Sequence, residues 1–443
     1  MDNIILDKYQ LKAVKTRRKK VLVLAGAGSG KTLVIEKRIR YLINEKKVNP
    51  KDILCISFTN DSVNKLKKDL SDVDINIMTF HKLGLKIIGR KKEVLSEDML
   101  KDIVMDSFSD YTLLSLFNMP KNDMINLIET FINMFKSSGK KLDDFYTFIK
   151  KADFKEKKLL KEIMKCFICY EAYLKKENII DFNDMINEAY DALDKSSVRY
   201  KYIIIDEYQD TSFTKFKLIK KLIKLSNAYF FAVGDDFQSI YRFTGAYLKV
   251  ITDFKKTFLF SKIIKLKNTY RNPDSLIKIA GKFIMRNPYQ IKKKLRSNIL
   301  SKNVIEIVYY SDLNSKIKSV IKEDKIDNLF ILSRNNKTLD DIKIDNKNYK
   351  KLTVHKSKGL ESDYVFVLDL NDKSCGFPNK YKDHKILRFV NDYKEYFPYE
   401  EERRLFYVAL TRCKKKVYLF APEDNPSCFV KEISKYKNVL KRK

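Results

Sequence analysis

Short apolar runs alternate with amphipathic segments along most of the chain, and this alternation predicts an α/β fold. Short apolar runs that end in polar residues are typical of buried parallel strands whose carboxyl ends carry a site. The first set of such runs lies at 19–24, 53–58, 202–205 and 229–233. A second alternation of strands and helices begins at about residue 263, with strand candidates at 304–308, 329–332, 364–368 and 417–420. We therefore expect two α/β domains in tandem.

The pattern becomes helical between about 90 and 180. Glycines nearly vanish there, and apolar residues recur every three or four positions. One predicted helix carries an apolar face formed by Leu159, Leu160, Ile163, Met164, Phe167 and Tyr170. We expect a first α/β domain in two parts, 1–89 and 181–262, which a helical insertion at 90–180 separates. The second α/β domain then occupies 263–443.

The strand candidate at 19–24 leads directly into the sequence AGAGSGKT, and an amphipathic helix follows. A strand, a glycine-rich loop and a helix in this order predict a phosphate-binding loop. Its backbone N–H groups would surround phosphates at a helix N-terminus. Lys31 would pair with the β- and γ-phosphates, and the Thr32 hydroxyl would bind Mg²⁺. The expected nucleotide-binding residues are Ala25, Gly26, Ala27, Gly28, Ser29, Gly30, Lys31 and Thr32.

An acidic pair, Asp206 and Glu207, follows the strand candidate at 202–205. In a protein with a phosphate loop, one carboxylate of such a pair holds Mg²⁺ through water, and the next activates the attacking water. We therefore assign Asp206 to the metal and Glu207 to catalysis. A solvated acidic pair is the alternative interpretation, and the preceding apolar strand makes it the weaker one.

The chain is strongly basic, with 90 Lys and Arg against 57 Asp and Glu and a net charge of +33. Solubility and codon bias explain such a surplus in one interpretation, and a nucleic-acid partner in the other. No apolar run approaches the roughly 18 residues that a membrane span requires. Six Cys and three His form neither a disulfide framework nor a zinc quartet, and the CxxC at 166–169 lies in a helical pattern that favours core packing.

These motifs resemble those of superfamily 1 helicases of the UvrD/Rep type, and they follow the family's order over nearly the whole chain. The matching segments are 6–10 (Q motif), 25–32 (I), 57–60 (Ia), 79–84 (Ib), 181–184 (DFND), 205–212 (II), 233–246 (III), 268–272 (IV), 353–361 (V) and 401–413 (VI). The spacing of GDDFQSIYRFTGA and EERRLFYVALTR is similar to that of the helicase IV branch. The resemblance implies two RecA-like parallel-sheet domains.

The chain departs from the family pattern before motif V. UvrD/Rep proteins carry a large helical insertion there, whereas the strand candidate ILSR is followed by motif V after only 335–352. We therefore expect the second accessory subdomain to be absent. The Q motif also begins at residue 6, where helicase IV has an additional preceding region.

The resemblance implies ATP and Mg²⁺ as cofactors and a nucleotide site that the second domain completes. Arg271 and Arg412 would reach the γ-phosphate and stabilise charge in the transition state. A surface salt bridge is the alternative for either arginine taken alone. Gln238 would sense the γ-phosphate. The residues expected around adenine and ribose are Tyr270, Gln10 and Glu361, and the expected catalytic set is Lys31, Glu207, Gln238, Arg271 and Arg412.

The resemblance also implies a track for single-stranded DNA. Such a track requires aromatic faces for bases and cations or hydroxyls for phosphates. Phe58, Tyr241 and Phe243 are the expected stacking residues. Phe243 stands where the family often has Trp, and this chain has no Trp. The candidate backbone contacts are Thr59, Asn60, His81, Thr353, His355 and Lys356; core packing is the alternative for the two histidines. Arg242 is a further expected DNA-binding residue.

Two functions remain open from the sequence. The first is an ATP-driven 3′ to 5′ translocase or helicase on single-stranded or 3′-tailed DNA, in the cytoplasm and on the nucleoid if bacterial, that serves repair, recombination or replication. The second is an ATP-gated DNA sensor or loader subunit that acts with a nuclease or repair partner, for example in phage defence. ATP hydrolysis with and without single-stranded DNA, measured beside strand displacement, distinguishes them.

Overall fold

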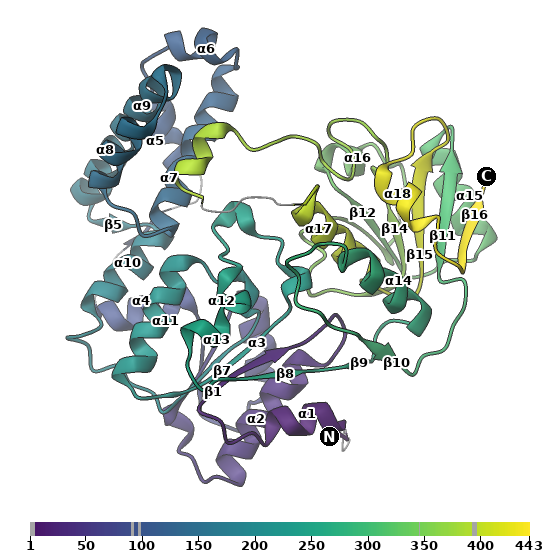
Figure 1. The fold of residues 1–443 in the computed structure, drawn as a ribbon, viewed down its shortest axis with the longest axis horizontal. Helices are drawn as coiled ribbons and strands as arrows, with labels where there is room; N and C mark the ends of the chain where they lie inside the picture. The colour runs from purple at the N-terminus through teal and green to yellow at the C-terminus, as the bar shows by residue number, and fades with distance from the viewer. Residues whose placement is uncertain (1–4, 90–92, 96–98, 345, 392–396) are drawn as a thin grey trace.

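Two six-stranded parallel sheets lie in tandem, each covered by helices (Figure 1). The structure is a computed structural model that describes residues 5–89, 93–95, 99–344, 346–391 and 397–443. The first sheet has the order β3-β2-β6-β7-β1-β8, and all its neighbours are parallel. Its strands are β1 (Lys20–Leu24), β2 (Ile53–Ser57), β3 (Asn76–Thr79), β6 (Tyr202–Ile205), β7 (Tyr229–Gly234) and β8 (Lys262–Lys265).

The second sheet has the order β13-β12-β14-β15-β11-β16 and is parallel throughout. Its strands are β11 (Ile305–Tyr310), β12 (Leu329–Ser333), β13 (Tyr349–Thr353), β14 (Ser362–Val367), β15 (Cys413–Pro422) and β16 (Val439–Arg442). Two short strands, β9 (Asn268–Thr269) and β10 (Arg296–Ser297), pair separately. The two predicted parallel-sheet domains are confirmed.

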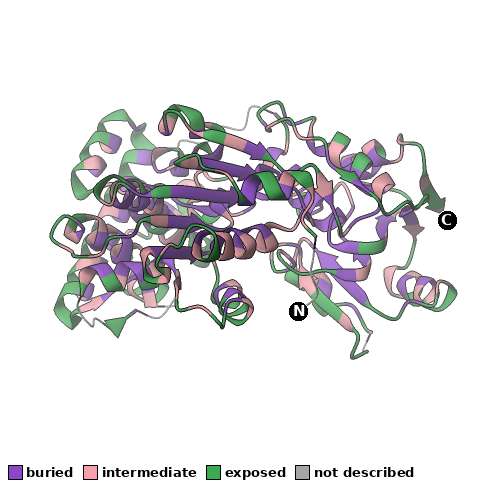
Figure 2. Cartoon of the chain, turned by 90° about the horizontal axis from the view of Figure 1, so that it is seen from below, coloured by how far each residue is buried: buried purple, intermediate pink, exposed green. Residues whose placement is uncertain are grey.

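Helices cover both sheets because the central strands are apolar on both faces. Around the first sheet lie α1 (Lys8–Val14), α2 (Lys31–Asn44), α3 (Asn60–Asp69), α4 (Phe80–Ile88), α10 (Phe182–Ala192), α11 (Phe213–Leu225), α12 (Lys249–Thr252) and α13 (Phe254–Thr257). The second domain has α14 (Asp274–Ile284), α15 (Leu313–Glu323), α16 (Asn336–Asp340), α17 (Glu400–Leu410) and α18 (Cys428–Ile433). Figure 2 shows buried strands between helices with exposed outer faces.

The helical insertion is a body with its own core. It contains α5 (Met99–Ser107), α6 (Thr112–Phe117), α7 (Lys121–Ser137), α8 (Leu142–Lys151) and α9 (Phe154–Glu177). The chain leaves and re-enters the first domain beside a parallel pair, β4 (Glu93–Val94) and β5 (Ile179–Ile180). The predicted apolar face lies on α9, where Leu159, Leu160 and Ile163 are fully buried.

Two features bear on the predicted organisation. The expected boundary between residues 262 and 263 falls inside β8, which pairs with β1 and completes the first sheet. Between β12 and β14, the described residues carry only the five-residue helix α16 and the strand β13, so they hold no second accessory subdomain. No helix in the described ranges combines the length and apolar character needed to cross a membrane.

Candidate nucleotide site and nucleic-acid groove

The phosphate loop joins the end of β1 to the start of α2 at Lys31. Gly28 and Gly30 have φ angles of 68° and 76°, a left-handed conformation that glycine adopts without steric cost. A Cβ on Gly28 would lie 2.5 Å from the Cβ of Arg271 and 2.6 Å from Oγ1 of Thr269. The glycine therefore permits both the turn and the close approach of the motif IV segment to the loop.

Lys31 and Glu207 face each other across the loop. The Nζ of Lys31 donates to both carboxylate oxygens of Glu207 at 2.6 Å. Burial by itself would raise the pKa of Glu207, but the charges of Lys31 and then Lys358 outweigh it and lower this pKa to about 2. The carboxylate is therefore ionised at neutral pH, as a general base must be. The backbone φ angle of Glu207 is 47°, a strained value for a residue with a side chain, and such strain is concentrated at functional sites.

The oxygen atoms expected to bind Mg²⁺ fit that ion. Asp206 is 6% exposed at the carboxyl end of β6, and Thr32 is the second residue of α2. Carboxylate and hydroxyl oxygens are hard ligands that suit Mg²⁺. Burial, followed by the charge of Glu207, raises the pKa of Asp206, and Lys31 opposes that rise. A cation at Asp206 would stabilise its ionised form. The metal assignment itself stays a prediction.

Arg412 and Gln238 meet across the two domains. Arg412 follows α17 and is 1% exposed, and its Nη2 donates to Oε1 of Gln238 at 3.1 Å. The Nε2 of Gln238 in turn donates to Oδ2 of Asp235 at 2.6 Å. Burial, followed by the charge of Arg271, lowers the pKa of Arg412 to about 9, so the guanidinium stays charged at neutral pH. The predicted γ-phosphate sensor and the predicted arginine finger are thus in contact.

Arg271 lies beside the phosphate loop but is held by an acidic residue of motif V. Its Nε donates to Oε2 of Glu361 at 2.7 Å, and Glu361 also forms an ion pair with Lys414 at 2.9 Å. Burial would raise the pKa of Glu361, but Lys414 and Arg271 lower it, so this carboxyl is ionised. Its contact with ribose and the contact of Arg271 with the γ-phosphate both stay predictions.

The predicted adenine contacts lie at the mouth of the loop. The backbone N–H of Tyr270 donates to the carbonyl of Gly28 at 2.9 Å, and its hydroxyl donates to Oδ2 of Asp7 at 2.6 Å. Gln10 is 2% exposed, and its Nε2 donates to the carbonyl of Ser29 at 3.2 Å. Gln10 therefore supports the phosphate loop here, and its contact with adenine stays a prediction. Asp7, which the motifs did not single out, connects the Q motif to Tyr270.

The expected stacking residues form one cluster of rings. Phe58 and Tyr241 stack with centroids 5.7 Å apart and planes 18° apart. Phe243 lies 6.0 Å from Tyr241 and 5.5 Å from His355, edge to face in both cases. Because Phe243 is 56% exposed, its ring is open to solvent beside the others.

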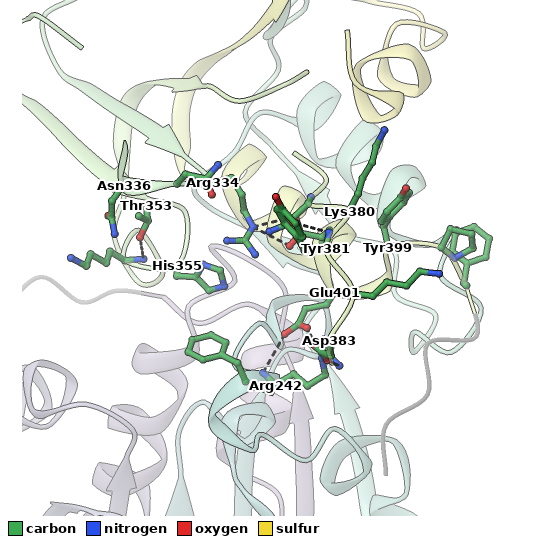
Figure 3. A pocket seen from close by; sticks show the side chains of 18 residues that line it. Arg242, Arg334, Asn336, Thr353, His355, Lys380, Tyr381, Asp383, Tyr399 and Glu401 are labelled. Carbon is green, nitrogen blue, oxygen red and sulfur yellow. Dashed lines mark hydrogen bonds and ion pairs between the residues drawn. The ribbon is translucent and has the colours of Figure 1, made fainter. Parts of the chain in front are cut away.

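A groove of about 1250 Å³ adjoins this cluster (Figure 3). Its lining includes Arg242, Phe243, Thr353, His355 and Lys356, all predicted DNA contacts. Thr59 and Asn60 are exposed at the start of α3, outside the residues that line the groove. The predicted DNA contacts of motifs III and V thus line one groove, whereas Thr59 and Asn60 of motif Ia lie outside its lining.

The charge of three predicted polar DNA contacts, Arg242, His81 and His355, is set by their neighbours. Arg242 forms ion pairs with Glu401 at 2.6 Å and with Asp383 at 2.7 Å, so two carboxylates already neutralise it. The ring centroid of His81 lies 4.9 Å from that of Phe182. Burial, followed by nearby cationic side chains, lowers the pKa of both His81 and His355 to about 4. Both rings are therefore neutral at pH 7.

Lys358 connects the two sites and was missed by the sequence analysis, which singled out Lys356 in the same motif. Its Nζ lies 2.5 Å from Oδ2 of Asp210, donates to the carbonyl of Gln238 at 2.8 Å and lies 4.7 Å from the ring centroid of Tyr241. The sequence of the motif does not show which of the two lysines has a buried partner, because that partner, Asp210, is distant in the sequence.

Lys293 was also missed. It is the middle residue of a run of three lysines, which is typical of a solvated surface. Its side chain is only 2% exposed and forms ion pairs with Asp235 and, at 2.6 Å, with Asp236. Asp235 also holds Gln238. A buried chain of contacts therefore runs from Lys293 through Asp235 and Gln238 to Arg412.

Two α/β domains whose predicted nucleotide-binding residues meet, as Gln238 and Arg412 do, are typical of proteins that bind a nucleotide between domains, and comparison with known proteins gives the family. Residues 6–259 match the model of the UvrD/REP helicase N-terminal domain, and residues 326–423 match the UvrD-like helicase C-terminal domain. The chain belongs to the UvrD/Rep helicase family of ATP-hydrolysing DNA helicases. The resemblance to UvrD/Rep helicases and the expectation of two RecA-like domains are confirmed.

Three relatives illustrate the range of similarity. DNA helicase IV of Escherichia coli (strain K12) is 30% identical over 96% of this chain and 69% of its own length. A probable DNA helicase of Mycoplasma pneumoniae (strain ATCC 29342 / M129 / Subtype 1) is 28% identical over 97% of this chain and 87% of its own length. ATP-dependent DNA helicase Rep of Buchnera aphidicola subsp. Acyrthosiphon pisum (strain APS) is 33% identical over 72% of this chain, which spans only 51% of that relative.

Proposed function

We propose that this protein is an ATP- and Mg²⁺-dependent translocase that moves 3′ to 5′ on single-stranded DNA and separates the strands of a 3′-tailed duplex. One observation carries the proposal: a single motif III segment contributes to both sites. Gln238 contacts the arginine finger Arg412, and three residues later Tyr241 stacks with Phe58 in the ring cluster. A displacement of this segment during hydrolysis would therefore reach the strand groove directly.

The residues of the nucleotide site have roles that fit this cycle. Bound ATP with Mg²⁺ supplies the phosphoryl-transfer chemistry. Lys31 would exchange its pairing with Glu207 for the β- and γ-phosphates, which frees Glu207 to accept a proton from the attacking water. Arg412 would stabilise the negative charge that develops on the transferred group. Since Arg412 comes from the second domain and the phosphate loop from the first, hydrolysis would depend on closure of the two domains around the nucleotide.

The biological setting belongs to the same proposal: action on cytoplasmic or nucleoid DNA during repair, recombination or replication. A second candidate is an ATP-gated sensor or loader that acts with a nuclease or repair partner. It is favoured by one observation, namely that the described residues between β12 and β14 carry only a short helix and a strand where relatives of this type have a large insertion. Such a protein would hydrolyse ATP on DNA without separating strands.

Two assays test the proposal. ATP hydrolysis is measured with and without an oligothymidylate, and strand displacement is measured on duplexes with a 3′ tail or a 5′ tail. We expect DNA-stimulated hydrolysis and displacement from the 3′ tail alone, with both lost in Lys31→Ala. Stimulated hydrolysis without displacement or directional movement supports the sensor. Displacement from the 5′ tail refutes the direction, and hydrolysis by Lys31→Ala refutes the site.

A further inference from the structure

A segment of the second domain crosses to the helical insertion, and we call residues 378–391 the strap. After β14 the chain leaves the second sheet, and the short helix η5 (Lys385–Phe389) lies beside the helical insertion as the yellow-green turn near α7 (Figure 1). Ile386, Leu387 and Val390 are at most 8% exposed and belong to the hydrophobic core of the insertion. Apolar side chains of the second domain are thus buried in the insertion.

Further contacts fix the position of the strap. The ring centroid of Phe389 lies 5.3 Å from that of Phe148 on α8. The Nη2 of Arg388 donates to Oε2 of Glu156 on α9 at 2.7 Å, and the side chain of Glu156 is 5% exposed. Burial of the apolar side chains and this ion pair together hold the strap against the insertion.

The part of the strap before η5 lines the groove that holds Phe243 and His355. It is tied to the second domain where the N–H of Asn379 donates to Oε2 of Glu402 at 2.9 Å. It is tied to motif III where Asp383 pairs with Arg242 at 2.7 Å. Residues 380–382 therefore span a short distance between two fixed points, as part of the wall of the groove.

Tyr381 is the aromatic residue of this span. It is 73% exposed and is one of the groove residues drawn in Figure 3, and the neighbouring Lys382 is exposed as well. An exposed ring beside a cation is the combination that binds single strands without sequence preference. Arg242 contributes little net charge to the groove, because Glu401 and Asp383 neutralise it.

We propose that the strap is an additional wall of the single-strand groove, in which Tyr381 stacks on a base and Lys382 contacts a phosphate. This inference rests on the proposed function and names a part of the strand site that lies outside the helicase motifs. Single-stranded DNA is the occupant because the groove joins the ring cluster of Phe58, Tyr241 and Phe243 to exposed lysines on two walls, Lys356 and Lys382.

The stacking role is tested by the affinity of a fluorescent oligothymidylate, titrated at several salt concentrations. Tyr381→Ala should weaken binding about 5- to 140-fold, because one stacked base is worth about 1–3 kcal/mol. Tyr381→Phe keeps the ring and should bind nearly as the wild type does. The matched control is Tyr111→Ala, which removes a 53% exposed tyrosine of the insertion that also has a lysine, Lys121, 5.3 Å from its ring.

The proposed phosphate contact of Lys382 is tested by the salt dependence of binding. Lys382→Ala should reduce the slope of log K against log salt by about 0.7, the value for one phosphate contact on a single strand. Tyr381→Ala should leave that slope unchanged. Phe389→Ala, which weakens the anchor of the strap on α8, should also reduce affinity for the oligonucleotide. Thermal melting of each variant reports whether the fold has been disturbed.

The outcomes separate this inference from the proposed function. If Phe243→Ala weakens binding and Tyr381→Ala binds with wild-type affinity, the strap proposal is overturned and the proposed function stands. A Tyr381→Ala protein that melts clearly lower than Tyr111→Ala has lost a structural contact, and this also overturns the proposal. A wild-type protein that does not bind the oligonucleotide refutes the proposed function itself.

Discussion

Replacing Lys293 by methionine should show that a residue outside the helicase motifs supports the catalytic ones. The lysine side chain is 2% exposed, and its partners Asp235 and Asp236 are fully buried. Methionine keeps a long apolar chain against Phe237, whose ring centroid lies 3.8 Å from the lysine Nζ. The substitution therefore removes the charge and leaves most of the packing.

The magnitude follows from what remains buried. Removing one partner of a buried ion pair costs about 3–5 kcal/mol, because the other charge loses its compensation. Asp236 keeps hydrogen bonds from Gln290 at 2.7 Å and from the N–H of Ile291 at 2.8 Å. Asp235 keeps the N–H of Phe237 at 3.1 Å and Gln238. We expect Lys293→Met to lower the free energy of unfolding by about 3 kcal/mol, the low end of that range.

Catalysis should decline as well. Without Lys293, Asp235 is no longer fixed on that side, so the Gln238 side chain that it holds is positioned less well against Arg412. Because these two residues are assigned to the γ-phosphate, kcat should fall by about tenfold or more, which corresponds to about 1.4 kcal/mol in the barrier. Affinity for ATP should change much less, since Lys31 is untouched.

The assay compares Lys293→Met with Lys292→Met and Lys294→Met, which change exposed lysines on either side. Denaturant unfolding gives stability, and steady-state hydrolysis gives kcat and KM. Equal stability of all three variants would refute the buried network.

Three further predictions concern the proposed sites. Glu207→Gln should bind ATP and fail to hydrolyse it, because the attacking water loses its base; nucleotide binding and phosphate release measure the two effects, and normal hydrolysis contradicts the assignment. Arg412→Ala should reduce kcat by far more than it weakens ATP binding, and equal losses would indicate a structural role instead. The salt slope of oligonucleotide binding should be the same at pH 5.5 and pH 7, because His81 and His355, with pKa values of about 4, stay neutral over that range, and Lys215, whose pKa burial lowers to about 8, stays charged; a steeper slope at pH 5.5 would show that a histidine gains charge at the DNA.

The central strands could be predicted from the sequence, and the edge strands could not. β2 and β12 are buried along their whole length, so each is a continuous apolar run. The four unpredicted strands of the two sheets are β3, β8, β13 and β16, and these form the outer edges. An edge strand has a neighbour on one side only and commonly carries lysine, which discourages pairing with other chains. β8 reads KIIK and β13 reads YKKLT, so neither has a purely apolar pattern.

The site shows a similar division. Residues with a fixed place in a motif, such as Gln238 and Arg412, could be named in advance, and the structure brings them together. Lys293 and Lys358 could not, because a lysine in a basic chain is normally solvated, and only the fold shows which lysine faces buried carboxylates. Arg242 illustrates the converse. Its motif position predicted a contact with DNA, which stays a prediction, and only the fold shows that Glu401 and Asp383 pair with it.

The strap affects how the two domains can move during a cycle. Ile386, Leu387 and Val390 are buried in the helical insertion, although the chain around them belongs to the second domain. Burial of three such side chains is worth about 5–9 kcal/mol, so undocking at every step would cost a large part of the free energy of one ATP. Opening and closing of the two domains would therefore leave the strap docked on the helical insertion. The helical insertion would then follow the second domain, and the strand groove that the strap lines would keep its wall in both states.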